Sequence, residues 1–155
     1  MLNNKVTILK KVTSQDFREI NRLISGLSLG KIRPRPLTMS QFTQLLSQKN
    51  VFVLIVRVGT GKEKKIIGFL TVYLVRIPSG VVAVSEDLLV DEQYRKWGVG
   101  RFLMEYGINL AEKKGARHIS LRTNPNRLEA NKLYEQMGFN LVTTNFFRIN
   151  LPRKK

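Results

Sequence analysis

The chain has 155 residues, of which 43% are hydrophobic and 25% are charged, and this size and balance predict one domain, residues 1–155, around a single core. It contains no cysteine and one histidine, His118, which excludes disulfides, thiolate catalysis and cysteine-ligated metals and leaves no histidine-based metal site. Its formal net charge of +16 at neutral pH predicts attraction to anions, among them phosphorylated cofactors, nucleic acid and acidic protein surfaces.

The N-terminal part predicts one short strand and two amphipathic helices. Each helix begins with a capping box or a variant of it, in which Thr13 precedes Asp16 and Thr38 precedes Gln41. Apolar residues then recur at helical spacing. The expected elements are a strand at Val6–Leu9, a helix from about Ser14 to Ser25 that ends near Gly26, a proline-containing basic loop at Gly30–Pro36, and a helix from Thr38 to near Asn50.

The middle of the chain predicts a meander of three strands, because β-branched and apolar residues dominate three runs separated by turn residues. The runs are Val51–Val58, Ile66–Ile77 and Val81–Val90, joined by the hairpin loop Gly59–Lys65 and the tight turn Pro78-Ser79-Gly80.

The remaining chain predicts two helices, each followed by extended structure. The expected elements are a helix from Val99 to about Lys114, a strand at His118–Arg122, a turn at Thr123–Asn126, a helix at Arg127–Met137, strands at Phe139–Val142 and Phe146–Leu151, and a disordered tail, 152–155. A meander followed by β-α-β crossovers implies an α/β fold with a mixed sheet and helices on both faces.

The stretch from Arg95 to Arg101 has the features of an anion-binding turn. It follows an apolar strand, contains Gly98 and Gly100, and leads into a helix N-terminus whose free N–H groups attract negative charge. Two commoner phosphate motifs fail here. A Walker A loop needs Lys and then Ser or Thr after its last glycine, and a dinucleotide fingerprint needs a third glycine where Leu103 stands.

Three segments together resemble the GNAT superfamily of acetyl-CoA-dependent N-acetyltransferases. They are the strand Val84–Asp91, the pattern Tyr94-Arg95-x-x-Gly98-x-Gly100, and Glu129-Ala130-Asn131-x-x-Tyr134-x-x-x-Gly138-Phe139. The resemblance covers roughly Val51 to Phe147. It implies a GNAT-like fold, in which a central, mostly antiparallel sheet has splayed central strands. One departure is Lys96, which stands where the family often has glycine.

The resemblance also implies the cofactor contacts. The backbone N–H groups of the turn would hold the pyrophosphate of CoA, and the splayed strand would pair with the pantetheine arm. The N–H group of Val90 would polarise the thioester carbonyl. Trp97 would cover a CoA group or simply pack on the helix. The expected cofactor-binding residues are Leu88, Leu89, Val90, Arg95, Lys96, Trp97, Gly98, Val99, Gly100, Arg101 and Asn131.

Two kinds of catalytic residue are expected in this frame. A free amine is mostly protonated at neutral pH, so a base must remove its proton. Glu86, acting directly or through a water molecule, is the first choice, and Asp87 is the second, because one step along a strand reverses the face. Tyr134 would protonate the departing CoA thiolate. The alternative is that Tyr134 is a core tyrosine and the carboxylates are structural or solvated.

The expected function is therefore transfer of an acetyl group from acetyl-CoA to a primary amine of a small molecule or peptide, by direct attack in a ternary complex and without a metal. The alternative is a basic nucleic-acid-binding or regulatory module on the same fold without catalysis, which the net charge favours. An acidic or nucleic-acid-associated partner fits either hypothesis. With no apolar run long enough for a membrane span and no signal-peptide core, a cytoplasmic monomer or homodimer is expected.

Overall fold

The computed structural model describes residues 5–26, 36–61, 64–149 and 151. The basic loop expected at Gly30–Pro36 lies outside these residues except for Pro36, and so does the tail, 152–155. The chain divides into two compact units, residues 1–122 and residues 123–155, and each is described by itself below.

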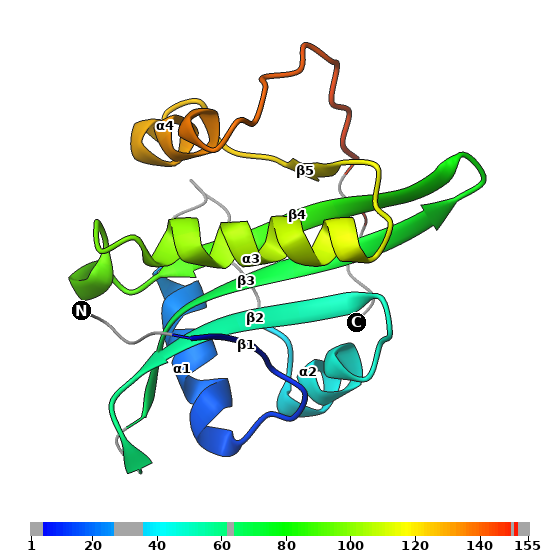
Figure 1. Cartoon of the computed structure of the whole chain (residues 1–155). Helices are drawn as coiled ribbons and strands as arrows, with labels where there is room; N and C mark the ends of the chain where they lie inside the picture. Colours follow the sequence, from blue (N-terminus) through cyan, green and yellow to red (C-terminus); the bar gives the residue numbers. More distant parts are fainter. Residues whose placement is uncertain (1–4, 27–35, 62–63, 150, 152–155) are drawn as a thin grey trace. The chain divides into compact units, whose positions relative to one another are not determined.

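The strands of the first unit form one sheet in the order β1-β2-β3-β4-β5 (Figure 1). Neighbouring strands are antiparallel except β4 and β5, which are parallel, so the predicted mixed sheet is confirmed. The strand bounds are β1 Val6–Ile8, β2 Val51–Val58, β3 Lys65–Ile77, β4 Gly80–Val90 and β5 Ile119–Leu121.

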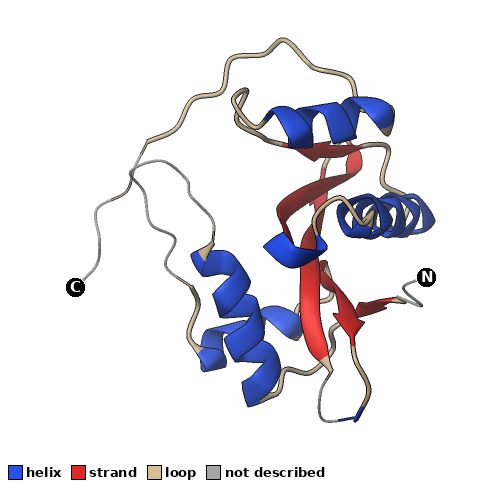
Figure 2. Cartoon of the chain, turned by 90° about the vertical axis from the view of Figure 1, so that its left-hand side faces the viewer, coloured by secondary structure: helices blue, strands red, loops and turns tan. Residues whose placement is uncertain are grey.

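Helices cover both faces of this sheet, as expected (Figure 2). On one face lie α1 (Ser14–Ser25) and α2 (Met39–Leu46), and on the other lies α3 (Val99–Lys113). Both predicted capping boxes form. The second helix is shorter than predicted, because it ends in a cap at Ser47 and a turn precedes β2.

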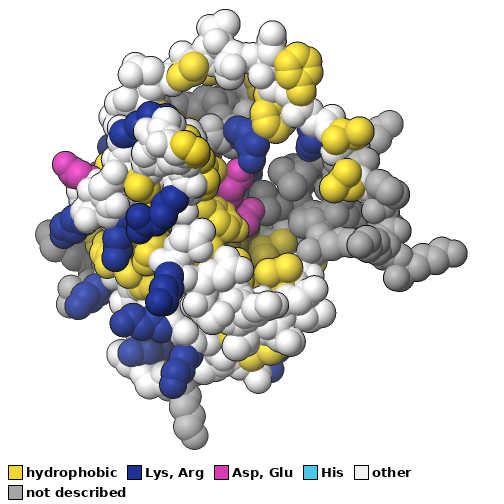
Figure 3. All heavy atoms as spheres, turned by 90° about the vertical axis from the view of Figure 1, so that its right-hand side faces the viewer, with side chains coloured by type: hydrophobic (Ala, Val, Ile, Leu, Met, Phe, Trp, Pro, Cys, Tyr) yellow, Lys and Arg dark blue, Asp and Glu magenta, His cyan; other side chains and the backbone are white. Residues whose placement is uncertain are grey.

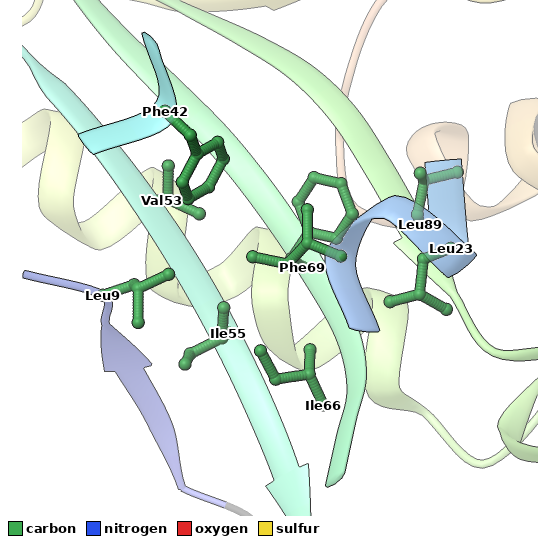
Figure 4. Packing of buried hydrophobic residues seen from close by; sticks show 9 residues of the cluster. Leu9, Leu23, Phe42, Val53, Ile55, Ile66, Phe69 and Leu89 are labelled. Atoms are coloured by element: carbon green, nitrogen blue, oxygen red, sulfur yellow. The ribbon is translucent and has the colours of Figure 1, made fainter. Parts of the chain in front are cut away.

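The core under α1 and α2 is formed by side chains that point toward one another from the helices and the sheet (Figure 4). Leu23 of α1 and Phe42 of α2 meet Ile55 of β2 and Phe69 of β3 there. The opposite face receives α3 at close range. A Cβ atom on Gly107 would lie 3.1 Å from a methyl group of Leu70, so the absence of a side chain lets the helix approach the sheet.

Two irregularities of β4 position the candidate site. Glu86 lies opposite Thr71 and Leu89 lies opposite Phe69, so β4 has one extra residue between these pairs, which is a β-bulge. Within the bulge, Asp87 has a φ of 54°, in the left-handed region that aspartate tolerates better than most residues. On its other edge, β4 pairs with β5 only from Ala83 to Ser85. The remaining part of β4 therefore extends beyond its partner, as the splayed strand of the resemblance implied.

The second unit contains the helix α4 (Leu128–Gln136), close to its predicted bounds. The strands predicted at Phe139–Val142 and Phe146–Leu151 are wrong, because the described residues of both segments form no strand. Apolar alternation is a local signal, whereas a strand exists only when its backbone pairs with another strand. Leu141 and Phe147 remain almost fully exposed here.

Candidate active site

The end of β4 presents backbone groups on one edge where the described residues provide no neighbouring strand. The N–H group of Asp91 donates to the carbonyl of Ile67 on β3, and the N–H group of Ala83 donates to His118 on the other side. Successive residues of a strand direct these groups to opposite sides. With the bulge taken into account, the backbone N–H and C=O groups of Leu88 and Val90 point away from β3. Both residues follow Ser85, the last residue of β4 that pairs with β5.

Leu89 differs from its two neighbours. Its backbone faces β3, where it lies opposite Phe69, and its side chain is buried in the core under α1 and α2. Of the three consecutive residues predicted to contact the cofactor, Leu88 and Val90 therefore keep backbone groups available, and Leu89 serves the core.

Three ionisable side chains, Glu86, Asp87 and Tyr73, form what we call the acidic cluster. Burial raises the pKa of Asp87, and the neighbouring negative charge of Glu86 raises it further. Burial also raises the pKa of Tyr73, with added contributions from Asp87 and then Glu86. Since Glu86 pairs with Thr71 and Tyr73 lies two residues further along β3, the cluster is on the α1 and α2 face. The bulge interrupts the alternation that would otherwise have separated the two carboxylates.

The two carboxylates of the cluster have different surroundings. Glu86 accepts a hydrogen bond of 2.6 Å from the guanidinium of Arg122, which follows β5. Asp87 is exposed enough for a substrate to reach it, yet enough protein surrounds it to disfavour its charge. A raised pKa brings a carboxylate closer to the range in which a general base works near neutral pH, so Asp87 is a candidate base.

Asp91 connects the end of β4 to α1 and β3. Its Oδ2 atom lies 2.8 Å from Nη1 of Arg22 and 2.9 Å from Nζ of Lys65, and its Oδ1 accepts from the N–H group of Gln93. The side chain is 6% exposed. Burial alone would raise the pKa of Asp91, but hydrogen bonds from Lys65, Gln93 and Arg22 outweigh it and hold the pKa below its ordinary value.

The turn after β4 ends in a helix N-terminus with free amide groups. A short 3₁₀ helix, Glu92–Tyr94, follows Asp91, and Gly98 is the N-cap of α3 with a φ of 80°. Gly98 has no side chain to cap the helix, so the first N–H groups of α3 are available to an anion. The side chain of Val99 is buried, which leaves its backbone as the part that could contact a ligand.

Lys96 shows how this turn adapts to a side chain where glycine is common. Its φ is 65°, in the left-handed region, which costs an L-residue about 1–2 kcal/mol.

We expect Lys96→Gly to raise the free energy of unfolding by up to about 1 kcal/mol, because relief of this strain is partly offset by the greater freedom of glycine in the unfolded chain. The same change removes a cation from the turn, so acetyl-CoA affinity should fall. Chemical denaturation and calorimetry separate the two effects, and Lys96→Gln provides the control that removes the charge and keeps the strain. A loss of stability in Lys96→Gly would contradict the strain argument.

Other side chains of the turn pack on one another. The rings of Tyr94 and Trp97 meet edge to face with centroids 5.7 Å apart, and the ammonium of Lys65 lies 5.9 Å from the Tyr94 ring. Arg95 pairs with Glu92 at 3.3 Å. Trp97 is nevertheless 60% exposed, so it packs on a neighbour and also presents a free aromatic surface.

Two predicted site residues, Asn131 and Tyr134, belong to the second unit. The side-chain amide nitrogen of Asn131 donates to the backbone carbonyls of Asn124, Pro125 and Arg127, so it fixes the turn before α4. Its oxygen is the atom that could still serve a ligand. The Tyr134 ring lies edge to face with Phe139 at 5.8 Å. The assignment of both residues to the active site stays a prediction.

Neither Tyr73 nor the roles of Asp91, Arg22 and Lys65 could be recognised from sequence motifs. Tyr73 carries no motif, and its place in the acidic cluster follows only from the register of β3 and β4. Asp91 is part of the family pattern, but that pattern does not predict its pairing with Arg22 and Lys65, which lie far from it along the chain. Within the described residues, no group of three or more histidines and carboxylates could hold a metal, and no helix has the length and apolar character needed to cross a membrane.

The model of the "Acetyltransferase (GNAT) family" matches residues 20–139. A segment of 57 residues is 37% identical to the [Ribosomal protein bS18]-alanine N-acetyltransferases of Escherichia coli strain K12 and Shigella flexneri. The match covers 37% of this chain and 38% of the length of those relatives.

Solved structures share the fold over nearly the whole chain. An acetyltransferase of Trypanosoma brucei superposes with a TM-score of 0.74 at 18% identity, covering 96% of this chain and 100% of its own. A ribosomal-protein-alanine N-acetyltransferase of Brucella melitensis biovar Abortus 2308 gives 0.69 at 17% identity, covering 96% and 99%. At such low identity these similarities establish the fold alone.

Proposed function

Because the chain belongs to the acetyltransferase (GNAT) family, we propose that it transfers the acetyl group of acetyl-CoA directly to an amine bound in the same complex. The observation that carries this proposal is a juxtaposition on one strand. The two carboxylates of the acidic cluster, Glu86 and Asp87, lie on β4. Directly after them come Leu88 and Val90, whose backbone groups face away from β3. A base and a donor for the thioester oxygen are thus adjacent along the chain.

In this proposal the cofactor lies along the end of β4 with its pyrophosphate at the N-terminus of α3. The free N–H groups of that helix and its dipole favour the phosphate charge by roughly 0.3–2 kcal/mol. The backbone of Leu88 pairs with the pantetheine arm. The N–H group of Val90 donates to the thioester oxygen, whose negative charge grows as the amine attacks.

The proton leaves the amine through the acidic cluster. The carboxylate of Asp87 accepts one proton from the protonated amine, and the lone pair that this frees on the nitrogen bonds to the thioester carbon. The carbon–sulfur bond then breaks, the thiolate sulfur takes a proton from Tyr134, and the acylated nitrogen loses its second proton to solvent. The carboxylate of Glu86 is occupied by the guanidinium of Arg122 at 2.6 Å and lies beside Asp87. The structure thus favours Asp87 over Glu86, the reverse of the order that strand alternation suggested.

Tyr134 completes this scheme as the acid that protonates the CoA thiolate. We expect Tyr134→Phe to lower kcat by about 10²–10⁴-fold with little change in the Kd of acetyl-CoA, because only the proton transfer is lost. Stopped-flow thiol detection and calorimetry measure the two quantities. Tyr106→Phe on α3 removes a hydroxyl outside the proposed site and should leave both unchanged. Equal losses of kcat and of cofactor affinity would assign Tyr134 to packing.

The acceptor is proposed from the chemistry of the site and of the relatives. A carboxylate base next to a second carboxylate suits an amine that arrives protonated and positively charged. The matched relatives are named for acetylation of an alanine in a ribosomal protein. Peptides with an N-terminal alanine are therefore the first acceptors to test, followed by small primary amines.

Two measurements test the proposed function. Titration calorimetry at low salt should detect acetyl-CoA binding, and a peptide and amine panel with thiol detection should release CoA with at least one acceptor. Absence of acetyl-CoA binding would defeat the proposal. The competing hypothesis of a nucleic-acid-binding module without catalysis gains no support from the comparisons, which lead to acetyltransferases.

A further inference from the structure

One end of the sheet gathers positive charge that the proposed acetyl transfer does not use. At this end β1 and β3 finish, β2 and β4 begin, and α3 ends. Exposed cations come from β3, from the end of α3 and the residues after it, and from residues beside β1 and β2. Figure 3 shows Lys and Arg side chains gathered over the lower left of one face. We call this surface the basic end and define it by Lys10, Lys49, Arg76, Lys113, Lys114 and Arg117.

The contacts of Phe52 show that part of this surface is continuous. The ammonium of Lys114 lies 5.7 Å from the centroid of the Phe52 ring. Leu9 donates its N–H group to Val53, so the next residue, Lys10, lies beside Phe52 across the strand pair. Lys49 is three residues before Phe52 on the same connection into β2. Lys114 thus contacts the Phe52 ring, and Lys10 and Lys49 belong to backbone segments next to Phe52.

The other cations extend the surface across the sheet. Arg76 lies opposite Val81, at the hairpin between β3 and β4. The guanidinium of Arg117 donates hydrogen bonds to the backbone carbonyl and to the hydroxyl oxygen of Ser79 in the same hairpin. With neighbouring strands about 4.8 Å apart, β1 to β4 span roughly 15 Å. A row of cations this long could contact several successive phosphates of a nucleic acid.

The basic end cannot serve the pyrophosphate of the proposed cofactor. The pyrophosphate turn is at the N-terminus of α3, and Lys113 is at its C-terminus. A helix of 15 residues places them roughly 22 Å apart. Lys113 and Lys114 also favour the negative end of the helix dipole, but this explains neither Lys10 and Lys49 nor Arg76.

We propose that the basic end binds the phosphate backbone of a nucleic acid, as a second surface of an active enzyme. The positive charge is mostly lysine, which acts as a point charge toward phosphate and reads no base sequence. Protein interfaces usually have aromatic and apolar residues buried at their centre, and lysine is depleted there. At the basic end, the ring of Phe52 already lies under the ammonium of Lys114. The chemistry thus suits a nucleic acid better than an acidic protein.

Fluorescence anisotropy of the full chain with a labelled 20-base-pair RNA duplex and the matching DNA duplex, over a salt series, tests the proposal. For six contacts the logarithm of affinity should fall against the logarithm of salt concentration with a slope of roughly −5 on DNA. The variant Lys10→Gln/Lys49→Gln/Lys114→Gln should lose at least about tenfold in affinity at moderate salt and flatten the slope by about 2–3. Tighter binding of one duplex identifies the biological source of the phosphates.

The control variant removes the same charge from other exposed positions, as Lys5→Gln/Arg18→Gln/Lys64→Gln, and should keep most of the affinity. Both variants should bind acetyl-CoA like the natural chain, which shows that they are folded. Equal losses in the two variants would overturn the proposal, since net charge alone would then explain the binding. No duplex binding at low salt would also overturn it, as would binding of poly-glutamate in preference to either duplex.

Discussion

The variant Asp87→Asn should remove most acetyl transfer and still bind acetyl-CoA. Loss of the proposed base is expected to lower kcat/KM for the acceptor by about 10²–10⁴-fold. Asparagine matches the size of aspartate and also tolerates the left-handed conformation at a φ of 54°, so the bulge should persist. Steady-state thiol release and acetyl-CoA calorimetry measure the two properties separately.

The pH profile distinguishes Asp87 from Glu86. A base works when it is deprotonated, so kcat/KM should rise with pH through the pKa of Asp87, which lies above the ordinary aspartate value. This acid limb should vanish in Asp87→Asn. The matched variant Glu86→Gln should keep it but move it to lower pH, because the charge that helps to raise the pKa of Asp87 is gone. A Glu86→Gln variant without an acid limb, beside an Asp87→Asn variant that retains one, would make Glu86 the base.

The Asp87→Asn substitution should also stabilise the fold at neutral pH. The pKa of Asp87 is higher in the folded than in the unfolded chain, so its contribution to stability is full below the unfolded pKa and is lost as pH rises through the folded pKa. Asparagine stays uncharged and avoids that loss. Urea denaturation should show Asp87→Asn to be more stable than the natural chain at pH 7, with the difference shrinking below pH 4. A gain in stability with a loss of activity is the combination expected of a functional residue.

Local signals predicted most of the elements of the first unit. The capping boxes at Thr13 and Thr38 located two helix starts, because each cap depends only on residues within one turn. The glycines of the turn before α3 located the start of that helix, and Gly98 adopts the left-handed conformation there. The end of the second helix at Leu46 was less predictable, since it depends on the turn that leads into β2.

Features that depend on pairing between distant strands were not predictable. The bulge at Asp87 exists because β4 has one residue more than β3 between two paired positions, and a single strand sequence carries no record of that count. It is one reason why we propose Asp87 rather than Glu86 as the base, and the register of β3 and β4 beside it places Tyr73 in the acidic cluster. The C-terminal segment shows the opposite error, because the apolar alternation of Phe146–Leu151 predicted a strand that has no pairing among its described residues.

Asp91→Asn should weaken both the fold and the binding of acetyl-CoA. Asparagine can still cap Gln93, so the change removes chiefly the negative charge that faces Arg22 and Lys65. Loss of one partner from a fully buried pair costs about 3–5 kcal/mol. The side chains of Arg22 and Lys65 are 45% and 37% exposed, so water screens them and about 1–3 kcal/mol is the better expectation here.

The effect on the cofactor follows from the position of Asp91. It lies between Val90, the proposed donor to the thioester oxygen, and the turn proposed to hold the pyrophosphate. In Asp91→Asn the ion pairs with Arg22 of α1 and Lys65 of β3 are lost, so the end of β4 is held less firmly. Acetyl-CoA binding must then order this segment. An increase of about tenfold in the Kd of acetyl-CoA is expected, measured by calorimetry at a temperature where the variant is fully folded.

Asp16→Asn provides a matched control. Asp16 is also buried, lies 2.6 Å from Nη2 of Arg57, and has a pKa held below its ordinary value despite burial by its bonds to Arg57 and Thr13. For Asp16 and Asp91 alike, the lowered pKa gives stability that is present above the unfolded pKa and is lost as pH falls through the folded pKa. Both variants should therefore lose stability at pH 7 and approach the natural chain in acid. Only Asp91→Asn should bind acetyl-CoA more weakly, and equal weakening in both would mean that general stability, rather than the placement of the turn, sets cofactor affinity.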